Sequence, residues 1–70
     1  MAGENLKQIT DRELMVLALV ARGYNSGEIG KSLTITKATV QTHRRNMLRK
    51  TGFKNTQQMV GWGYREGLLK

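Results

Sequence analysis

The chain has 70 residues, which is enough for one small domain with a thin hydrophobic core. It has no cysteine and a single histidine, so disulfide bonds and metal sites built from thiolates or several histidines are excluded. Twelve Lys and Arg against five Asp and Glu give a net charge of +7, which favours a polyanionic partner. The longest apolar run, residues 14–21, is too short for a membrane span of roughly 20 residues, and we expect a cytoplasmic protein.

A flexible arm, residues 1–8, is predicted to precede the first helix, which we place at residues 10–22. Thr10 and Glu13 have the spacing of a capping box, in which each side chain bonds to the other residue's backbone N–H. Gly23 can adopt the left-handed conformation that ends the helix.

The second and third helices are predicted at residues 26–33 and 37–50. Asn25 and Glu28 form a second capping box, and Thr36 is the expected cap of the third helix. A short helix, a three-residue turn and a basic helix are typical of a helix-turn-helix motif.

The fourth helix is predicted at residues 56–66, with Asn55 as its cap. This helix also carries Trp62 and Tyr64. Aromatic side chains stack on single-stranded bases in some proteins, but packing in the core or in a dimer contact is the stronger interpretation of these two residues. The chain therefore reads as all-α, a four-helix bundle formed by residues 9–70.

The third helix has two opposed faces when its residues are placed about 100° apart. Gln41, Thr42 and Arg45 share a polar and basic face, which suits the major groove because Gln pairs with adenine and Arg with guanine. We expect the opposite, largely apolar face to point inward; it consists of Val40, His43, Met47 and Thr51.

Other interpretations of the basic helix remain open from the sequence. A solvated helix face would carry a mixture of Lys and Glu, yet no acid lies between Glu28 and Glu66. A non-sequence-specific RNA or single-strand binder would place aromatic residues among the basic ones, and the third helix has none. A helix that docks on a membrane or an acidic protein would have a broader apolar face. An enzyme is least favoured because no nucleophile with a base and no phosphate loop is present.

Several stretches of the chain resemble the DNA-binding domain of LuxR-type (NarL/FixJ, GerE-like) regulators. The resemblance covers residues 9–68, and the stretches are ITDRE at 9–13, VLALVARGY at 16–24, EIG at 28–30, LTIT at 33–36, TVQTH at 39–43 and RKTGF at 49–53. Two positions depart from the family pattern: Gly30 replaces alanine, which should loosen the second helix, and Thr51 replaces leucine, which should weaken the core.

The resemblance implies a sequence-specific regulator of transcription, associated with the nucleoid, that binds double-stranded DNA as a homodimer on inverted repeats. From the residues themselves we expect no cofactor, no metal, no catalytic residue, no membrane contact and no small-molecule site within this chain. The implied base contacts are Gln41, Thr42 and Arg45. The implied backbone contacts are Ser26, Lys37, Thr39, His43, Arg44, Arg49 and Lys50. The implied dimer interface, formed in solution or only on DNA, contains Thr56, Met59, Val60 and Tyr64.

Many members of the family carry a receiver or ligand-sensing domain ahead of this module. Seventy residues leave no room for one. We therefore expect either a stand-alone regulator or the effector domain of a longer protein.

Overall fold

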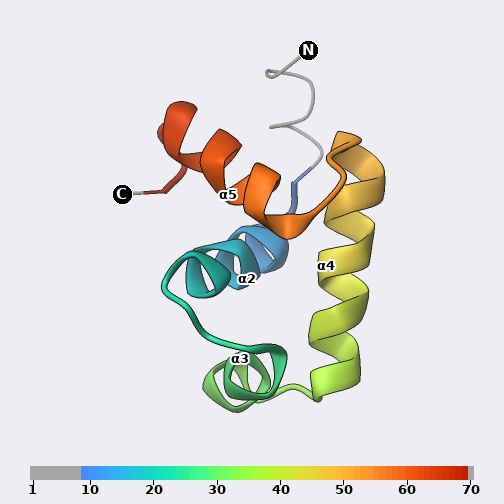
Figure 1. Cartoon of the computed structure of the whole chain (residues 1–70). Coiled ribbons are helices and arrows are strands. Elements are labelled where there is room, and N and C mark those ends of the chain that lie inside the picture. The colour runs from blue at the N-terminus through green and yellow to red at the C-terminus, as the bar shows by residue number, and fades with distance from the viewer. Residues whose placement is uncertain (1–8, 70) are drawn as a thin grey trace.

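The computed structural model describes residues 9–69, and within them it contains four helices and no strand. The helices are α2 (Asp11–Ala21), α3 (Ser26–Leu33), α4 (Lys37–Thr51) and α5 (Thr56–Arg65) (Figure 1). These bounds confirm the all-α prediction and each predicted helix to within one residue at either end. The predicted arm, residues 1–8, lies outside the described residues.

The helices begin at the predicted caps. The Thr10 hydroxyl accepts a hydrogen bond from the Glu13 N–H at 3.1 Å, and the Glu13 carboxylate accepts one from the Thr10 N–H at 3.0 Å. Asn25 and Glu28 form the same reciprocal pair at 2.8 and 2.9 Å. These bonds satisfy N–H groups that a helix start would otherwise leave unpaired, which explains why local sequence sets these boundaries.

The turn between α3 and α4 brings backbone segments into close contact. A Cβ added at Gly30 would lie 2.7 Å from the Ile35 carbonyl oxygen and 3.3 Å from the Lys37 nitrogen, so the missing side chain makes room for the turn and the first residue of α4. Thr34 ends α3 in the left-handed region, with φ 60° and ψ 44°, which is unfavourable for a β-branched residue. This turn fixes the angle at which α4 leaves α3.

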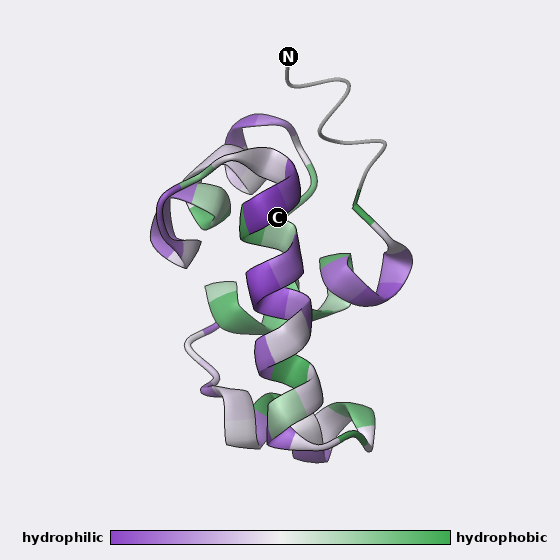
Figure 2. Ribbon diagram, turned by 90° about the vertical axis from the view of Figure 1, so that its right-hand side faces the viewer, coloured by the Kyte–Doolittle hydropathy of each residue, from purple (hydrophilic) through white to green (hydrophobic). Residues whose placement is uncertain are grey.

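The helix α4 packs against the other three helices, and α2 lies between α3 and α5 (Figure 1). The core at their meeting point consists of Val16, Leu17, Ile29, Val40, Met47, Met59, Trp62 and Leu69. Apolar residues lie mainly toward this centre and polar residues on the outward side of α4 (Figure 2). Burial of this core, rather than helix propensity, is what stabilises helices this short.

No helix among residues 9–69 is long and apolar enough to cross a bilayer. The same residues contain no group of three or more His, Cys, Asp or Glu placed to hold a metal ion.

Candidate nucleic-acid interface

The helix α4 has the two-faced arrangement that its sequence predicts. Val40 and Met47 are fully buried, whereas Gln41, Thr42 and Arg45 are exposed on the opposite side. The three predicted base-reading side chains therefore lie together on an open face of the helix. The packing of Val40 and Met47 against the other helices holds this face outward.

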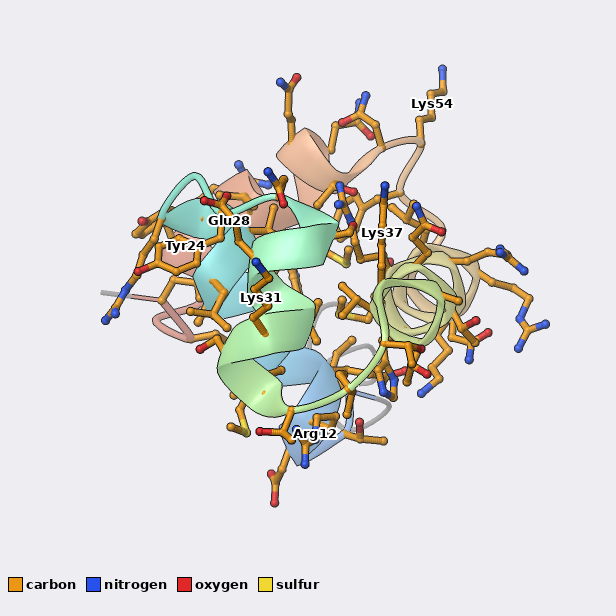
Figure 3. The ribbon with its side chains drawn as sticks, turned by 90° about the horizontal axis from the view of Figure 1, so that it is seen from below. Arg12, Tyr24, Glu28, Lys31, Lys37 and Lys54 are labelled. Atoms are coloured by element: carbon orange, nitrogen blue, oxygen red, sulfur yellow. The ribbon has the colours of Figure 1, made fainter. Side chains whose placement is uncertain are left out.

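The outward face of α4 is strongly basic. The helix carries five cations and no acid: Lys37, Arg45 and Arg49 are exposed, whereas Arg44 and Lys50 are half-buried. Figure 3 is viewed nearly along α4 and shows nitrogen-tipped side chains extending from the side that faces away from α2 and α3. An exposed helix with this charge has the electrostatic character that binding to a phosphate backbone requires.

Three of the predicted backbone-contacting residues are exposed around the base-reading face. Lys37 and Thr39 lie in the first turn of α4, and Lys37 is labelled in Figure 3. Arg49 lies in the last turn, where its guanidinium donates to the Asn46 side-chain oxygen at 3.2 Å. His43 is half-buried at the edge of the core, as its position on the helical wheel predicted.

Arg44 has an internal role that the sequence did not reveal. Its guanidinium is half-buried and donates to the Ser26 hydroxyl at 2.8 Å and, more weakly, to the Thr56 hydroxyl at 3.4 Å. Ser26 is only 6% exposed. Arg44 thus joins the first residues of α3 and α5 to the middle of α4. It also lines a shallow hollow beside Gln41 and Arg45.

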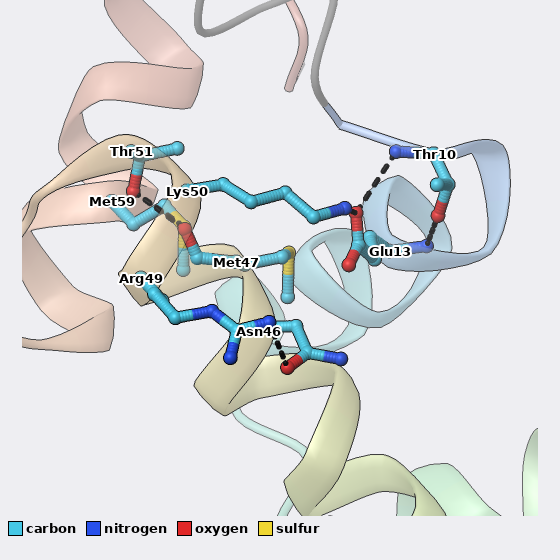
Figure 4. Close-up of polar contacts among 8 residues, drawn as sticks. All are labelled: Thr10, Glu13, Asn46, Met47, Arg49, Lys50, Thr51 and Met59. Atoms are coloured by element: carbon cyan, nitrogen blue, oxygen red, sulfur yellow. Dashed lines mark hydrogen bonds and ion pairs between the residues drawn. The ribbon is translucent and has the colours of Figure 1, made fainter.

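Lys50 is also turned toward the protein. Its ammonium lies 2.7 Å from the Glu13 carboxylate, joining the end of α4 to the start of α2 (Figure 4). Burial opposes ionisation of Glu13, but the hydrogen bond from Lys50, the bonds at Thr10 and the charge of Lys50 outweigh it and hold the pKa of Glu13 below its usual range. The implied phosphate contacts of Ser26, Arg44 and Lys50 therefore compete with contacts inside the domain.

Thr51 is half-buried and compensates in part for the absence of leucine. Its hydroxyl donates to the Met47 carbonyl at 2.7 Å and lies 3.9 Å from the Met59 sulfur (Figure 4). The Thr51 hydroxyl is therefore satisfied within the domain, one residue before Gly52 ends the helix with φ 78°.

The residues implied in a dimer interface divide into two groups. Tyr64 is 49% exposed, and Thr56 and Val60 are half-buried. Met59 is fully buried in the core, so its side chain has no surface to offer a partner, and we correct the set by removing it. The sequence placed Met59 on the same helix, but only the docking of α5 on α2 and α4 shows which of its residues face inward.

Trp62 packs in the core, as its stronger interpretation predicted. It is 5% exposed, and its ring centroid lies 5.6 Å from that of Phe53. A residue this deeply buried cannot stack on bases, which removes an aromatic group on which single-strand binding would depend.

Most of the chain also matches a protein-family model. Residues 7–62 match the model described as bacterial regulatory proteins, luxR family. The chain belongs to the LuxR family. It is therefore a helix-turn-helix DNA-binding domain of the kind found in transcriptional regulators, and this family is not enzymatic.

Curated relatives of this LuxR-family domain include the oxygen regulatory protein NreC from several strains of Staphylococcus aureus. The proteins from strains JH9, JH1 and Mu3 are each 33% identical to it over 64 residues. The match covers 91% of this chain but only 30% of each relative. No solved structure matches the chain.

Proposed function

We propose that this domain binds double-stranded DNA sequence-specifically, with α4 in the major groove and Gln41, Thr42 and Arg45 against the base edges. The observation that carries the proposal is the exposure of these three side chains on a basic face opposite Val40 and Met47. The major groove of B-DNA admits an α-helix, and Gln and Arg match the edges of adenine and guanine.

Phosphate contacts are assigned to Lys37, Thr39 and Arg49, which surround this face, and to His43, which is half-buried at the edge of the core. These groups would fix the position of α4 on the duplex without reading its sequence. Arg44 and Lys50 act instead mainly by holding α4 against α3, α5 and α2, as their bonds within the domain support.

The domain is proposed to bind inverted repeats as a homodimer through α5. Tyr64 and Val60 supply apolar surface on this helix, and Thr56 lies at its start. A two-fold dimer of helix-turn-helix domains reads half-sites about one helical turn apart. Because the chain spans about 30% of the length of its NreC relatives, we also propose that it works as the effector part of a longer regulator in the bacterial cytoplasm.

Selection of bound duplexes from a random pool tests this function. Enrichment of one motif, arranged as an inverted repeat, is expected. A Tyr64→Lys variant should keep binding to a single half-site and lose cooperative binding to the repeat, whereas Tyr24→Lys, at a tyrosine that is 42% exposed outside α5, should retain both. Equal binding to all duplexes, or a preference for single-stranded RNA, would contradict the proposal.

A further inference from the structure

Two small side chains lie between the polar groups on the outward face of α4. Ala38 precedes Thr42 by four residues, which places the two side chains one above the other on the helix surface. Both are exposed. Gln41 and Arg45 lie on the same side of the helix, so Ala38 stands within the face that the proposed function directs at the base edges.

The hydroxyl of Thr42 is bonded within the helix. Its oxygen donates to the Ala38 carbonyl oxygen at 3.0 Å, so its single proton is committed to the backbone. A threonine held in this way keeps its hydroxyl against the preceding turn and leaves its methyl group as the part that can meet a base. The methyl groups of Ala38 and Thr42 together form an apolar patch, which we name the methyl patch.

We propose that the methyl patch reads the 5-methyl group of a thymine, which makes Ala38 a specificity-determining residue beside Gln41, Thr42 and Arg45. The inference rests on the proposed function, because it requires α4 to lie in the major groove. The thymine methyl is the apolar group on the major-groove edges, where the other groups are hydrogen-bond donors and acceptors. A patch of two methyl groups without a free donor therefore favours thymine over the other bases.

Replacement of thymine by deoxyuridine in the selected duplex tests the inference directly. This change removes the methyl group and leaves every hydrogen-bonding group of the base in place. Each thymine of a half-site is replaced in turn, and the dissociation constant is measured with the full chain at one salt concentration. At one position in each half-site, the loss of the buried methyl contact is expected to weaken binding about four-fold.

Three variants assign that effect to the methyl patch. Thr42→Ser keeps the hydroxyl and removes the methyl group, so the thymine-to-uridine ratio at that position should fall to about one. Thr42→Val keeps a methyl group there, so the ratio should persist. Thr34→Ser removes the same methyl group from an exposed threonine in the turn before α4, outside the proposed DNA contacts, and should leave the ratio unchanged. Because each ratio compares two duplexes with one protein, a loss of folded protein cancels.

The outcomes separate the inference from the function on which it rests. A domain that binds every duplex equally would overturn both. A domain that selects a site without thymine in reach, or that tolerates uridine at every position, would overturn the methyl patch alone. The same conclusion follows if Thr42→Ser keeps the full thymine preference.

Discussion

The Lys50 ammonium and the Glu13 carboxylate lie 2.7 Å apart, across 37 residues of sequence. Glu13 is 3% exposed and also caps α2, so one carboxylate fixes both the start of that helix and the end of the helix proposed to enter the DNA. Lys50 is the partner that makes the burial of this charge tolerable.

Removing Lys50 should therefore destabilise the domain. Lys50→Met leaves the Glu13 carboxylate buried without its cation, and we expect the free energy of unfolding to fall by about 1–3 kcal/mol. Urea unfolding at pH 7 measures the loss. Glu28→Gln alters the other capping glutamate, which is exposed, and should change stability by less than about 0.5 kcal/mol. A loss in Lys50→Met no larger than that in Glu28→Gln would contradict the stabilising role of the ion pair.

The same pair gives stability a defined pH dependence. The pKa of Glu13 is lower in the folded state than in the unfolded chain, so the folded state binds its proton less readily. Its contribution is fully present above the unfolded value of about 4.3 and is lost as the pH falls through the lower folded value. The melting temperature measured between pH 7 and pH 2.5 should show this acid loss in the natural chain and less of it in Glu13→Gln. Identical acid profiles would contradict the assignment.

Thr34 should be replaceable by glycine with a gain in stability. Its φ of 60° places a β-branched residue in the left-handed region, where glycine has no steric penalty. Thr34→Gly should raise the free energy of unfolding by about 0.5–1 kcal/mol, or several degrees in melting temperature. Ser32→Gly, two residues earlier and inside α3, should lower it by a similar amount. A loss of stability in Thr34→Gly would show that its side chain makes a contact worth more than the strain.

Substitutions at the adjacent Arg44 and Arg45 should distinguish a residue that stabilises the fold from one that recognises DNA. Arg44→Gln breaks the bonds to Ser26 and Thr56, and we expect unfolding to become easier by about 1 kcal/mol for each good hydrogen bond lost. Arg45→Gln changes an exposed side chain and should leave stability within about 0.5 kcal/mol. Thermal unfolding of the two variants decides, and the reverse order of their stabilities would contradict the proposed division of roles.

Lys37 should contribute affinity without selectivity. Lys37→Ala removes one phosphate contact, so binding to all duplexes should weaken alike and the slope of log affinity against log salt should shrink by about 0.9. Titrations at several salt concentrations measure this slope. A loss confined to the selected motif would instead assign Lys37 to a base.

The helices were predictable because their boundaries depend on residues close in sequence. Thr10 with Glu13, and Asn25 with Glu28, settle two helix starts through bonds three residues apart. The exposed face of α4 also followed from its own periodicity. The bonds of Arg44 to α3 and α5 did not follow, because they depend on how separate helices dock. The same is true of Met59, whose burial is decided by the packing of α5 rather than by its sequence pattern.

The specificity ratio of Arg45→Ala tests most directly whether the outward face of α4 reads DNA sequence. The ratio is the affinity for the selected duplex divided by the affinity for a shuffled duplex at the same salt concentration. Loss of a base-reading arginine is expected to lower this ratio, and the difference in binding free energy between the two duplexes should shrink by about 1–3 kcal/mol. The affinity for the shuffled duplex should change little. An unchanged ratio, with both affinities weakened by the same factor, would contradict the base-reading role of this face.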